Sequence, residues 1–520
     1  MAIRPRLPRL SGVARFALAP AAAACVLGVL VDGGLKAAAT AVGAVAAVAA
    51  IVGAARRPAA ALGVVIVYVP LQLALLALLY HHGAPAAVVR NLGFLKEVMV
   101  AGVVLAAIHR LSRPDVRLRA DALDWTALGY VGIATAYLLL PLVFHGAFGG
   151  QTFQIRLIAW RTDVLFVVLM LAARRLPFSA TALRRLRAAV LAVAAVLVAF
   201  AFWEFAAGGS FNRFLINTLG LPAFKADILD VPYADPTNLI THGSLGGVTW
   251  ARVGSLLNDP LQLGFLLVIP LAFGLERLST KRLNLAQSLA CVMAAVAILM
   301  NGTRSAILAG LLAALLSIAV GVRRRSPGRL RVAIALLIGA VALAPIAGAT
   351  NAQSRFFGVS GAQSSDNQEH LTALQDSVEN ILRQPQGLGL GANPATGLRF
   401  GTSIARTSEN AYLQVGIELG AAAMLLFVAM LLLLLGQLRR VWTGRRDPTG
   451  LGAGVWLAGW GLALGGMFLH VWLGIATALT FWGLAGAVLG SQCAVDGESV
   501  GAVTDPDQRL ASQPVVGAIS

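Results

Sequence analysis

The sequence predicts an all-α, polytopic membrane protein with about 14 transmembrane helices (roughly 12 to 14). Three observations carry this prediction. Hydrophobic residues make up 58% of the 520 residues and charged residues only 12%, a composition that excludes a soluble globular protein. The apolar residues form runs of spanning length, whereas a membrane β-barrel shows short alternating segments. The Lys and Arg residues, which give a net charge of +18, lie in the turns between these runs.

Each predicted helix is an apolar run close to the ~20 residues that cross a bilayer. In chain order the runs are 13–31, 37–55, 61–80, 92–109, 124–144, 155–173, 188–206, 257–275, 285–301, 305–322, 332–349, 411–437, 451–469 and 473–491. The runs 155–173 and 285–301 are the weakest. The first run follows Arg4, Arg6 and Arg9, as a signal peptide would, but the next run begins almost at once. This spacing favours a first transmembrane helix.

Basic residues concentrate in every second turn. These turns hold Arg56-Arg57, Arg110 to Arg119, Arg174 to Arg187, Arg277 to Arg282, Arg323 to Arg331 and Arg439 to Arg446. Because basic turns stay on the cytoplasmic side, both chain ends are predicted to be cytoplasmic and segment 350–410 to lie outside. The positive charge therefore orients the protein in the membrane, and nucleic acid is excluded as a partner.

The same alternation divides the chain into six parts. They are N-terminal helices (1–206), an extracytoplasmic loop (207–256), central helices (257–349), a large extracytoplasmic loop (350–410), C-terminal helices (411–491) and a polar, disordered cytoplasmic tail (492–520). Within the large loop, an amphipathic helix is predicted from the helical spacing of Leu371, Leu374, Val378 and Leu382. Pro385 and the glycines after it are expected to end this helix. The three scattered cysteines predict neither a disulfide framework nor a metal site.

Four polar stretches interrupt the apolar pattern near the outer side of the membrane. They are Arg252 to Pro260 with Gly264, Asn301 to Ala306, Pro385 to Gly391, and Ser408 to Gln414 with Gly416 and Glu418-Leu419-Gly420. In this order they resemble the O-antigen ligase and polysaccharide polymerase family, over roughly residues 240–425. Ligases of that family usually carry a His-Asn pair where this sequence has Glu409-Asn410, which favours a polymerase-like member.

The resemblance implies an enzyme of cell-surface polysaccharide synthesis in a bacterial inner membrane. The donor would be a glycan linked to undecaprenyl diphosphate, and the acceptor a lipid core in ligases or another carrier-linked repeat unit in polymerases. The implied transfer is inverting and needs no metal or cofactor. Membrane lipid and other polysaccharide-assembly proteins would be its partners.

Charged residues at the membrane edge fit this chemistry. A guanidinium beside hydrocarbon is costly, so Arg304 is predicted to bind the diphosphate, with Arg252 as the other half of a clamp. The alternative for Arg304 is an interfacial arginine whose charge reaches the headgroups. Glu409 is the predicted base for the acceptor hydroxyl. Its alternative role is that of a first-turn helix residue, with Ser408 as the helix cap.

The remaining predicted site residues are substrate-binding: Asn410, Tyr412, Arg355, Arg383, Arg399, Arg406 and His370. For the four arginines the alternative is a solvated ion pair with an acidic residue of the same loop. His81, His82, His145, His242 and His470 are expected to be interfacial, because a metal needs three or four converging ligands. The roles of Lys96-Glu97 and Glu204 stay open.

Two other classes of protein compete with the transferase. A transporter or flippase for a glycolipid or small anion has a similar number of helices, but such proteins bind their cargo near the bilayer midplane. Here the polar candidates gather at the outer edge. A non-catalytic scaffold for envelope assembly is the third hypothesis, and it predicts that the loop arginines are dispensable.

Overall fold

The protein is described by a computed structural model that covers residues 35–114, 120–143, 151–245, 248–279, 285–323, 361–392, 408–444 and 449–492. The predicted runs 13–31 and 332–349, and nearly all of the tail 492–520, lie outside the described residues. The prediction of about 14 spans is therefore tested only for the other runs.

Apolar helices occupy the predicted runs that fall in the described residues. They are α2 (Leu35–Arg56), α3 (Pro58–His81), α4 (Ala86–Gly93), α5 (Leu95–Leu111), α6 (Ala122–Val143), α7 (Phe153–Ala173), α8 (Ala180–Ala206), α11 (Pro260–Ser279), α12 (Leu285–Asn301), α13 (Arg304–Arg323), α18 (Ala411–Thr443), α19 (Leu451–Gly465) and α20 (Ile475–Gly490). Five segments are long and apolar enough to cross a membrane: Pro58–His81, Ala86–Leu111, Ala122–Pro141, Ala180–Ala206 and Ala411–Thr443. The chain is a mainly helical integral membrane protein.

The segment between α8 and α11 is more ordered than the predicted loop. It forms α9 (Gly208–Arg213), a π-helical turn at Phe214–Thr218, α10 (Leu221–Leu229) and an antiparallel hairpin of β1 (Thr241–Leu245) and β2 (Val248–Arg252). The all-α prediction misses this hairpin, which pairs Thr241 with Arg252. Its sequence signal is the pair Gly246-Gly247 between two short segments, which is typical of a two-residue hairpin turn.

The amphipathic helix of the large loop is present as α16 (Gly361–Arg383), and it ends two residues before Pro385. Its packing face differs from the predicted one. Ala373, Ser377 and Ile381 are buried, whereas the four predicted apolar residues Leu371, Leu374, Val378 and Leu382 are 40 to 76% exposed. A Cβ at Gly416 of α18 would lie 2.6 Å from Ile381, so small residues bring these two helices into close contact.

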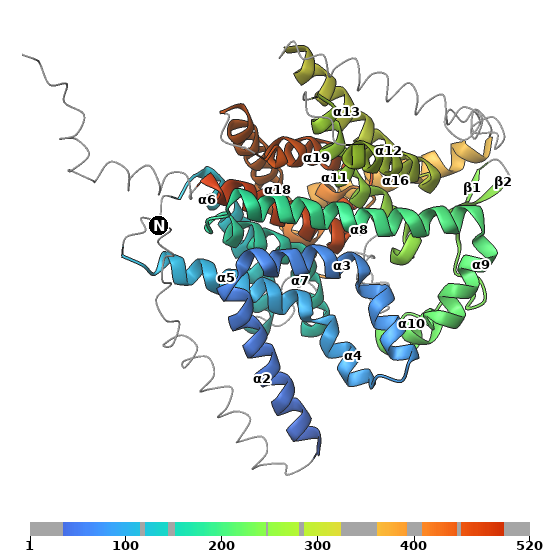
Figure 1. Ribbon diagram of the computed structural model, residues 1–520, viewed down its shortest axis with the longest axis horizontal. Coiled ribbons are helices and arrows are strands. Elements are labelled where there is room, and N and C mark those ends of the chain that lie inside the picture. The colour runs from blue at the N-terminus through green and yellow to red at the C-terminus, as the bar shows by residue number, and fades with distance from the viewer. Residues whose placement is uncertain are drawn as a thin grey trace, which may run out of the picture.

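The long helix α8 extends across the bundle (Figure 1), so that its first and last turns lie at opposite ends of the molecule. Its 27 residues are about 40 Å long at the rise of an α-helix. Glu204, in its last turn, binds the loop that carries the first polar stretch. We call this side the motif end. Arg187, near its start, pairs with Glu276 (3.4 Å) and donates to the carbonyls of Phe273 and Thr449.

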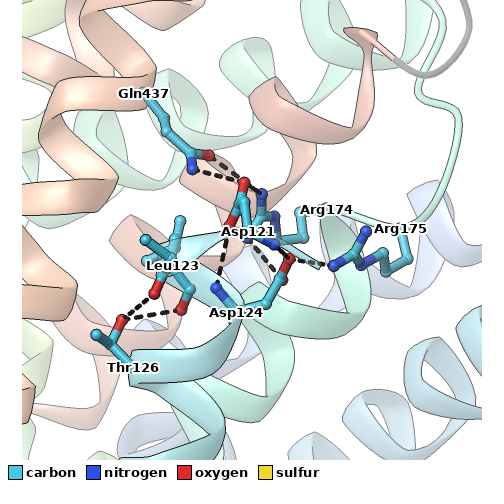
Figure 2. A network of polar contacts seen from close by, with 8 residues as sticks. Asp121, Leu123, Asp124, Thr126, Arg174, Arg175 and Gln437 are labelled. Atoms are coloured by element: carbon cyan, nitrogen blue, oxygen red, sulfur yellow. Dashed lines mark hydrogen bonds and ion pairs between the residues drawn. The ribbon is translucent and has the colours of Figure 1, made fainter. Parts of the chain in front are cut away.

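A second polar cluster lies where α7 ends, and we call it the Asp121 cluster (Figure 2). The Arg174 guanidinium binds Asp121 at 2.8 Å and Asp124 at 2.7 Å. Arg175 pairs with Asp124 as well, and the Gln437 amide donates to Asp121 at 2.8 Å. Because these residues come from three segments, the cluster ties together the start of α6, the end of α7 and the C-terminal part of α18.

Candidate functional site

The first polar stretch is a rigid loop held by a buried carboxylate. The Glu204 carboxylate accepts hydrogen bonds from the backbone N–H groups of Gly254 (2.9 Å) and Ser255 (2.7 Å). The Ser255 hydroxyl donates to the carbonyl of Leu197 at 2.7 Å. Ser255 has a positive φ of 53°, a backbone conformation that persists only where its surroundings fix it. This loop therefore presents its side chains in one arrangement.

The second polar stretch binds the same loop. The Asn301 side-chain amide donates to the carbonyls of Val253 (2.7 Å) and Pro260 (2.6 Å), at the two ends of the loop. Its oxygen accepts the N–H of Thr303, across a Gly302 whose φ of 69° allows the tight turn between α12 and α13. The first two stretches thus form one structural unit.

The two arginines predicted as a clamp belong to this unit. The Arg252 guanidinium donates to the Thr303 hydroxyl at 3.0 Å, which brings it to the residue just before Arg304. Arg304 is the first residue of α13, and its side chain is exposed. Both positive charges therefore stand at the motif end, as their sequence positions predicted.

The third and fourth stretches pair through their backbones. The N–H groups of Leu388 and Gly389 donate to the carbonyls of Ile417 (2.7 Å) and Glu418 (2.9 Å). In return, the N–H of Ala421 donates to the carbonyl of Pro385 at 2.8 Å. These contacts require a break inside α18, and Gly420 provides it with φ 86° and ψ 167°, which only glycine adopts without strain.

The residues at the start of α18 fasten that helix to the segment after α19. Asn410, and not Ser408 as predicted, is the helix cap: its side-chain oxygen accepts from the N–H groups of Tyr412 and Leu413. Its amide also donates to the carbonyl of Met467 at 2.9 Å, and the Tyr412 hydroxyl donates to the carbonyl of Ala463 at 2.7 Å. These contacts are structural, so substrate binding by Asn410 and Tyr412 stays a prediction. Glu409, half-buried, directly precedes the cap.

A chain of close contacts through α11 joins the two pairs of stretches. A Cβ at Gly264 would lie 3.0 Å from the Cβ of Ala306, the last residue of the second stretch, and one at Gly465 would lie 2.6 Å from Phe265. The following residue, Gly466, accepts the N–H of Ala411 at 2.8 Å. All four stretches, far apart in the sequence, therefore meet at the motif end.

Two cavities open at this end. The larger, about 550 Å³, we call the Arg252 cavity. Its charged and polar wall holds Arg252, Lys225, Asn258, Asp259, Gln262, Gln72 and Thr241, and its apolar wall comes mainly from Val69, Leu73 and Leu76 of α3, Phe224 and Leu229 of α10, and Ile475 of α20. Burial lowers the pKa of Lys225, although the nearby Asp259 carboxylate opposes that shift.

The second cavity, about 470 Å³, we call the Arg161 cavity. It is lined by Ile158, Arg161, Thr162, Asp259, Leu261, Gln262, Phe265, Leu469, His470, Val471, Leu473, Gly474 and Thr477. Arg161 pairs with Glu97 at 3.3 Å, and Glu97 pairs with Lys96 at 3.4 Å. Asp259, Leu261 and Gln262 line both cavities, so they form a shared wall, with the Gln262 amide donating to the Asp259 carboxylate at 2.9 Å.

Sequence reasoning missed three of these cavity residues. Lys225 lies in the predicted extracytoplasmic loop 207–256, and Arg161 lies in a predicted span. His470 was expected to be an ordinary interfacial histidine, yet it is half-buried and lines the Arg161 cavity. The available signal for Arg161 was the low hydropathy of its span, which also holds Arg156 and Asp163.

The structure shows less about the other predicted substrate-binding residues. Arg355, Arg399 and Arg406 lie outside the described residues, as does the side chain of His370. Arg383 is 75% exposed and pairs with Glu379 one helical turn earlier. This contact agrees with the alternative of a solvated ion pair, which contributes little to stability.

A comparison with protein families gives one match: the sequence model of the O-antigen ligases covers residues 289–428. By sequence, this region is an O-antigen ligase domain. The match takes in the second, third and fourth stretches. It begins after Arg252 and leaves out the helices that form most of the cavity walls. No curated protein matches the chain. The match supports membrane glycan transfer in general.

Proposed function

We propose that the chain transfers a glycan from undecaprenyl diphosphate to an acceptor hydroxyl at the outer leaflet of a bacterial plasma membrane. The motif end would then face away from the cytoplasm, with both chain ends inside. The carrying observation is the Arg252–Thr303 contact, because it joins the Arg252 cavity to the Arg304 helix within the family region.

The Arg252 cavity suits a lipid diphosphate. Its wall from α3 and α10 is apolar, as a polyprenyl chain requires, and Arg252 and Lys225 line the same space. A guanidinium binds phosphate oxygens through two parallel hydrogen bonds, which a lysine cannot reproduce. The bond to Thr303 holds the Arg252 guanidinium in one orientation, and such preorganisation favours stabilisation of the transition state.

Arg304 supplies the second positive charge of the proposed clamp. It is exposed at the start of α13, one residue after the hydroxyl that binds Arg252. Negative charge develops on the diphosphate as its bond to the sugar breaks, and two fixed cations would lower the energy of that state. The acceptor is a carrier-linked repeat unit in the polymerase form of this proposal, which Glu409 in place of a histidine favours.

The clamp is tested by substitution at Arg252 and Arg304. In cells whose own gene is deleted, Arg252→Ala and Arg304→Ala are each expected to reduce glycan transfer by roughly 10²–10³-fold, the usual effect of removing a group that stabilises the leaving charge. Arg252→Lys should restore little of the transfer lost in Arg252→Ala, because the lysine ammonium lacks the planar, two-pronged geometry of a guanidinium. The measurement is the length and amount of carrier-linked glycan on gels.

Arg185→Ala is the matched control, since Arg185 is exposed at the start of α8 on the opposite end. Wild-type glycan in both clamp variants, with the control also normal, would exclude this function for the pair. Flipping of a glycolipid by the purified protein in liposomes, with no new glycan formed, would favour the transporter instead.

A further inference from the structure

We propose that His470 is the general base that removes the proton of the acceptor hydroxyl, with the acceptor bound in the Arg161 cavity. This inference rests on the proposed glycan transfer and assigns its second substrate to a different cavity from the donor.

His470 stands where the fourth stretch meets the Arg161 cavity. It lies in the short segment between α19 and α20, and it is one of the residues that line the cavity. Its Nδ1 atom is 3.1 Å from the backbone carbonyl of Ser408, the residue before Glu409. The imidazole is thus fixed by a backbone contact to a stretch that lies about sixty residues earlier in the chain.

The contact with Ser408 determines the tautomer of the ring. A carbonyl oxygen only accepts hydrogen bonds, so the proton of the neutral imidazole must be on Nδ1. Nε2 then carries a lone pair and is the nitrogen able to accept a proton. A backbone carbonyl on one ring nitrogen is a usual way to orient a histidine for work at the other.

Burial keeps the ring neutral near pH 7. Burial lowers the pKa of His470, and the Ser408 carbonyl and the Asp259 carboxylate oppose this shift only in part. Asp259 reaches the cavity from the start of α11 and Arg161 from α7, while Glu409 follows Ser408 at the start of α18. A neutral imidazole at neutral pH is the form that a general base requires.

The shared wall gives the two substrates a common boundary. The Arg252 cavity pairs an apolar wall with cations, as the lipid diphosphate of the donor requires. The Arg161 cavity offers Thr162, Gln262, Thr477 and Asp259, groups that hydrogen-bond to sugar hydroxyls. A donor sugar that reaches the wall of Asp259 and Gln262 would meet an acceptor hydroxyl from the opposite side.

The step balances without any further reagent. The acceptor O–H proton moves to Nε2 of His470, and the freed electron pair forms a bond to the anomeric carbon of the donor sugar. The bond from that carbon to the diphosphate oxygen breaks, and its electron pair leaves with the carrier diphosphate. The imidazolium then releases its proton to water.

The test uses His470→Asn in the full-length protein. Asparagine places an N–H donor near the position of Nδ1 and can keep the Ser408 contact, but it has no basic nitrogen. Purified protein in liposomes is given carrier-linked repeat units extracted from cells that lack this protein. We expect transfer to fall by about 10²–10⁴-fold, the usual contribution of a general base. The wild-type rate should also fall as the pH drops below about 6.5, while the residual rate of His470→Asn should not follow that decline.

His82→Asn is the matched control, because Nδ1 of His82 also contacts a backbone carbonyl, that of Leu78 at 2.9 Å, but its ring is exposed and lines neither cavity. Gel filtration and a melting curve check that His470→Asn is folded, and His470→Gln serves as a second variant. A folded His470→Asn protein with a wild-type transfer rate would overturn the proposal. It would also be overturned if Glu409→Gln abolished the fall in transfer rate at low pH while His470→Asn kept that fall. Failure of the transferase itself looks different: the wild-type protein then forms no product.

Discussion

At the scale of single residues, the buried polar groups at the motif end hold the backbone. Glu204 binds two N–H groups of the first stretch, and Asn301 binds the carbonyls at both ends of that stretch. Removing one partner leaves the other groups buried without a hydrogen bond, which costs more than the bond itself contributes. These residues act on the site through the loop that they fix.

Replacing Glu204 tests this role. Glu204→Ala should destabilise the solubilised protein by roughly 1–3 kcal/mol, because the N–H groups of Gly254 and Ser255 lose their acceptor. The fall should appear as a lower melting temperature and a shorter carrier-linked glycan. Glu379→Ala, at an exposed position of α16, is the control and should melt like the wild type. Equal melting of the two variants would show that the loop does not depend on Glu204.

The sequence identified the residue types of the site better than their roles. Arg252 and Arg304 were predicted to lie close together at the membrane edge, and the Arg252–Thr303 contact brings Arg252 to the residue before Arg304. The pairing of Glu204 with Gly254, and of His470 with Ser408, joins residues far apart in the chain, and no local pattern encodes it. The preference for Asn410 over Ser408 as the cap likewise depends on where the helix begins.

At the scale of elements, helical periodicity predicted α16 but not the side by which it packs. The bulky apolar residues are conspicuous in the sequence, yet the buried residues are Ala373, Ser377 and Ile381. Of these, Ile381 contacts α18 at Gly416. Close approach of two helices favours small residues, so the largest apolar side chains need not mark the interface. The apolar runs, in contrast, predicted where the described helices lie, and five segments are long and apolar enough to cross a membrane.

The break in α18 is an element-scale feature that can be tested directly. A Cβ at Gly420 would lie 2.6 Å from the Pro385 carbonyl, and its φ of 86° is unfavourable for alanine. Gly420→Ala should therefore destabilise the protein by roughly 1–3 kcal/mol and detach the third stretch from the fourth. The measurements are melting temperature and protease sensitivity of residues 361–392.

Gly436 of the same helix gives the control, because a Cβ there meets nothing within 4 Å. Gly436→Ala should leave both measurements unchanged or raise the melting temperature slightly, since alanine favours a helix. If Gly420→Ala behaves in the same way, the break is not required for the contact between the two stretches.

At the scale of the whole molecule, the Asp121 cluster joins helices at the end opposite the motifs. Burial alone would raise the pKa of Asp121, but the Arg174 guanidinium and the Gln437 amide hold it well below its usual value. A carboxyl with a lowered pKa stabilises the fold at pH values above its unfolded pKa, near 4. This contribution is lost as the pH falls from about 4 through the folded pKa.

The melting temperature of the solubilised wild-type protein should therefore fall as the pH is lowered from about 5 to 3. In Asp121→Asn, the protein should melt lower at pH 7 and change less over the same range, because the titrating group is gone. A melting curve at each pH checks both statements. An unchanged acid slope in Asp121→Asn would mean that other carboxyls determine the acid stability.

The wall of Asp259, Leu261 and Gln262 has a consequence for how long the product becomes. If the donor occupies the Arg252 cavity and the acceptor the Arg161 cavity, each elongated glycan is formed in the Arg161 cavity. Before the elongated glycan can serve as the next donor, it must leave the Arg161 cavity and enter the Arg252 cavity. Synthesis would therefore pause for this exchange after every addition. The distribution of polymer lengths would then depend on how fast the product moves between the two cavities. Substitutions in the shared wall that widen or block the passage would change this distribution.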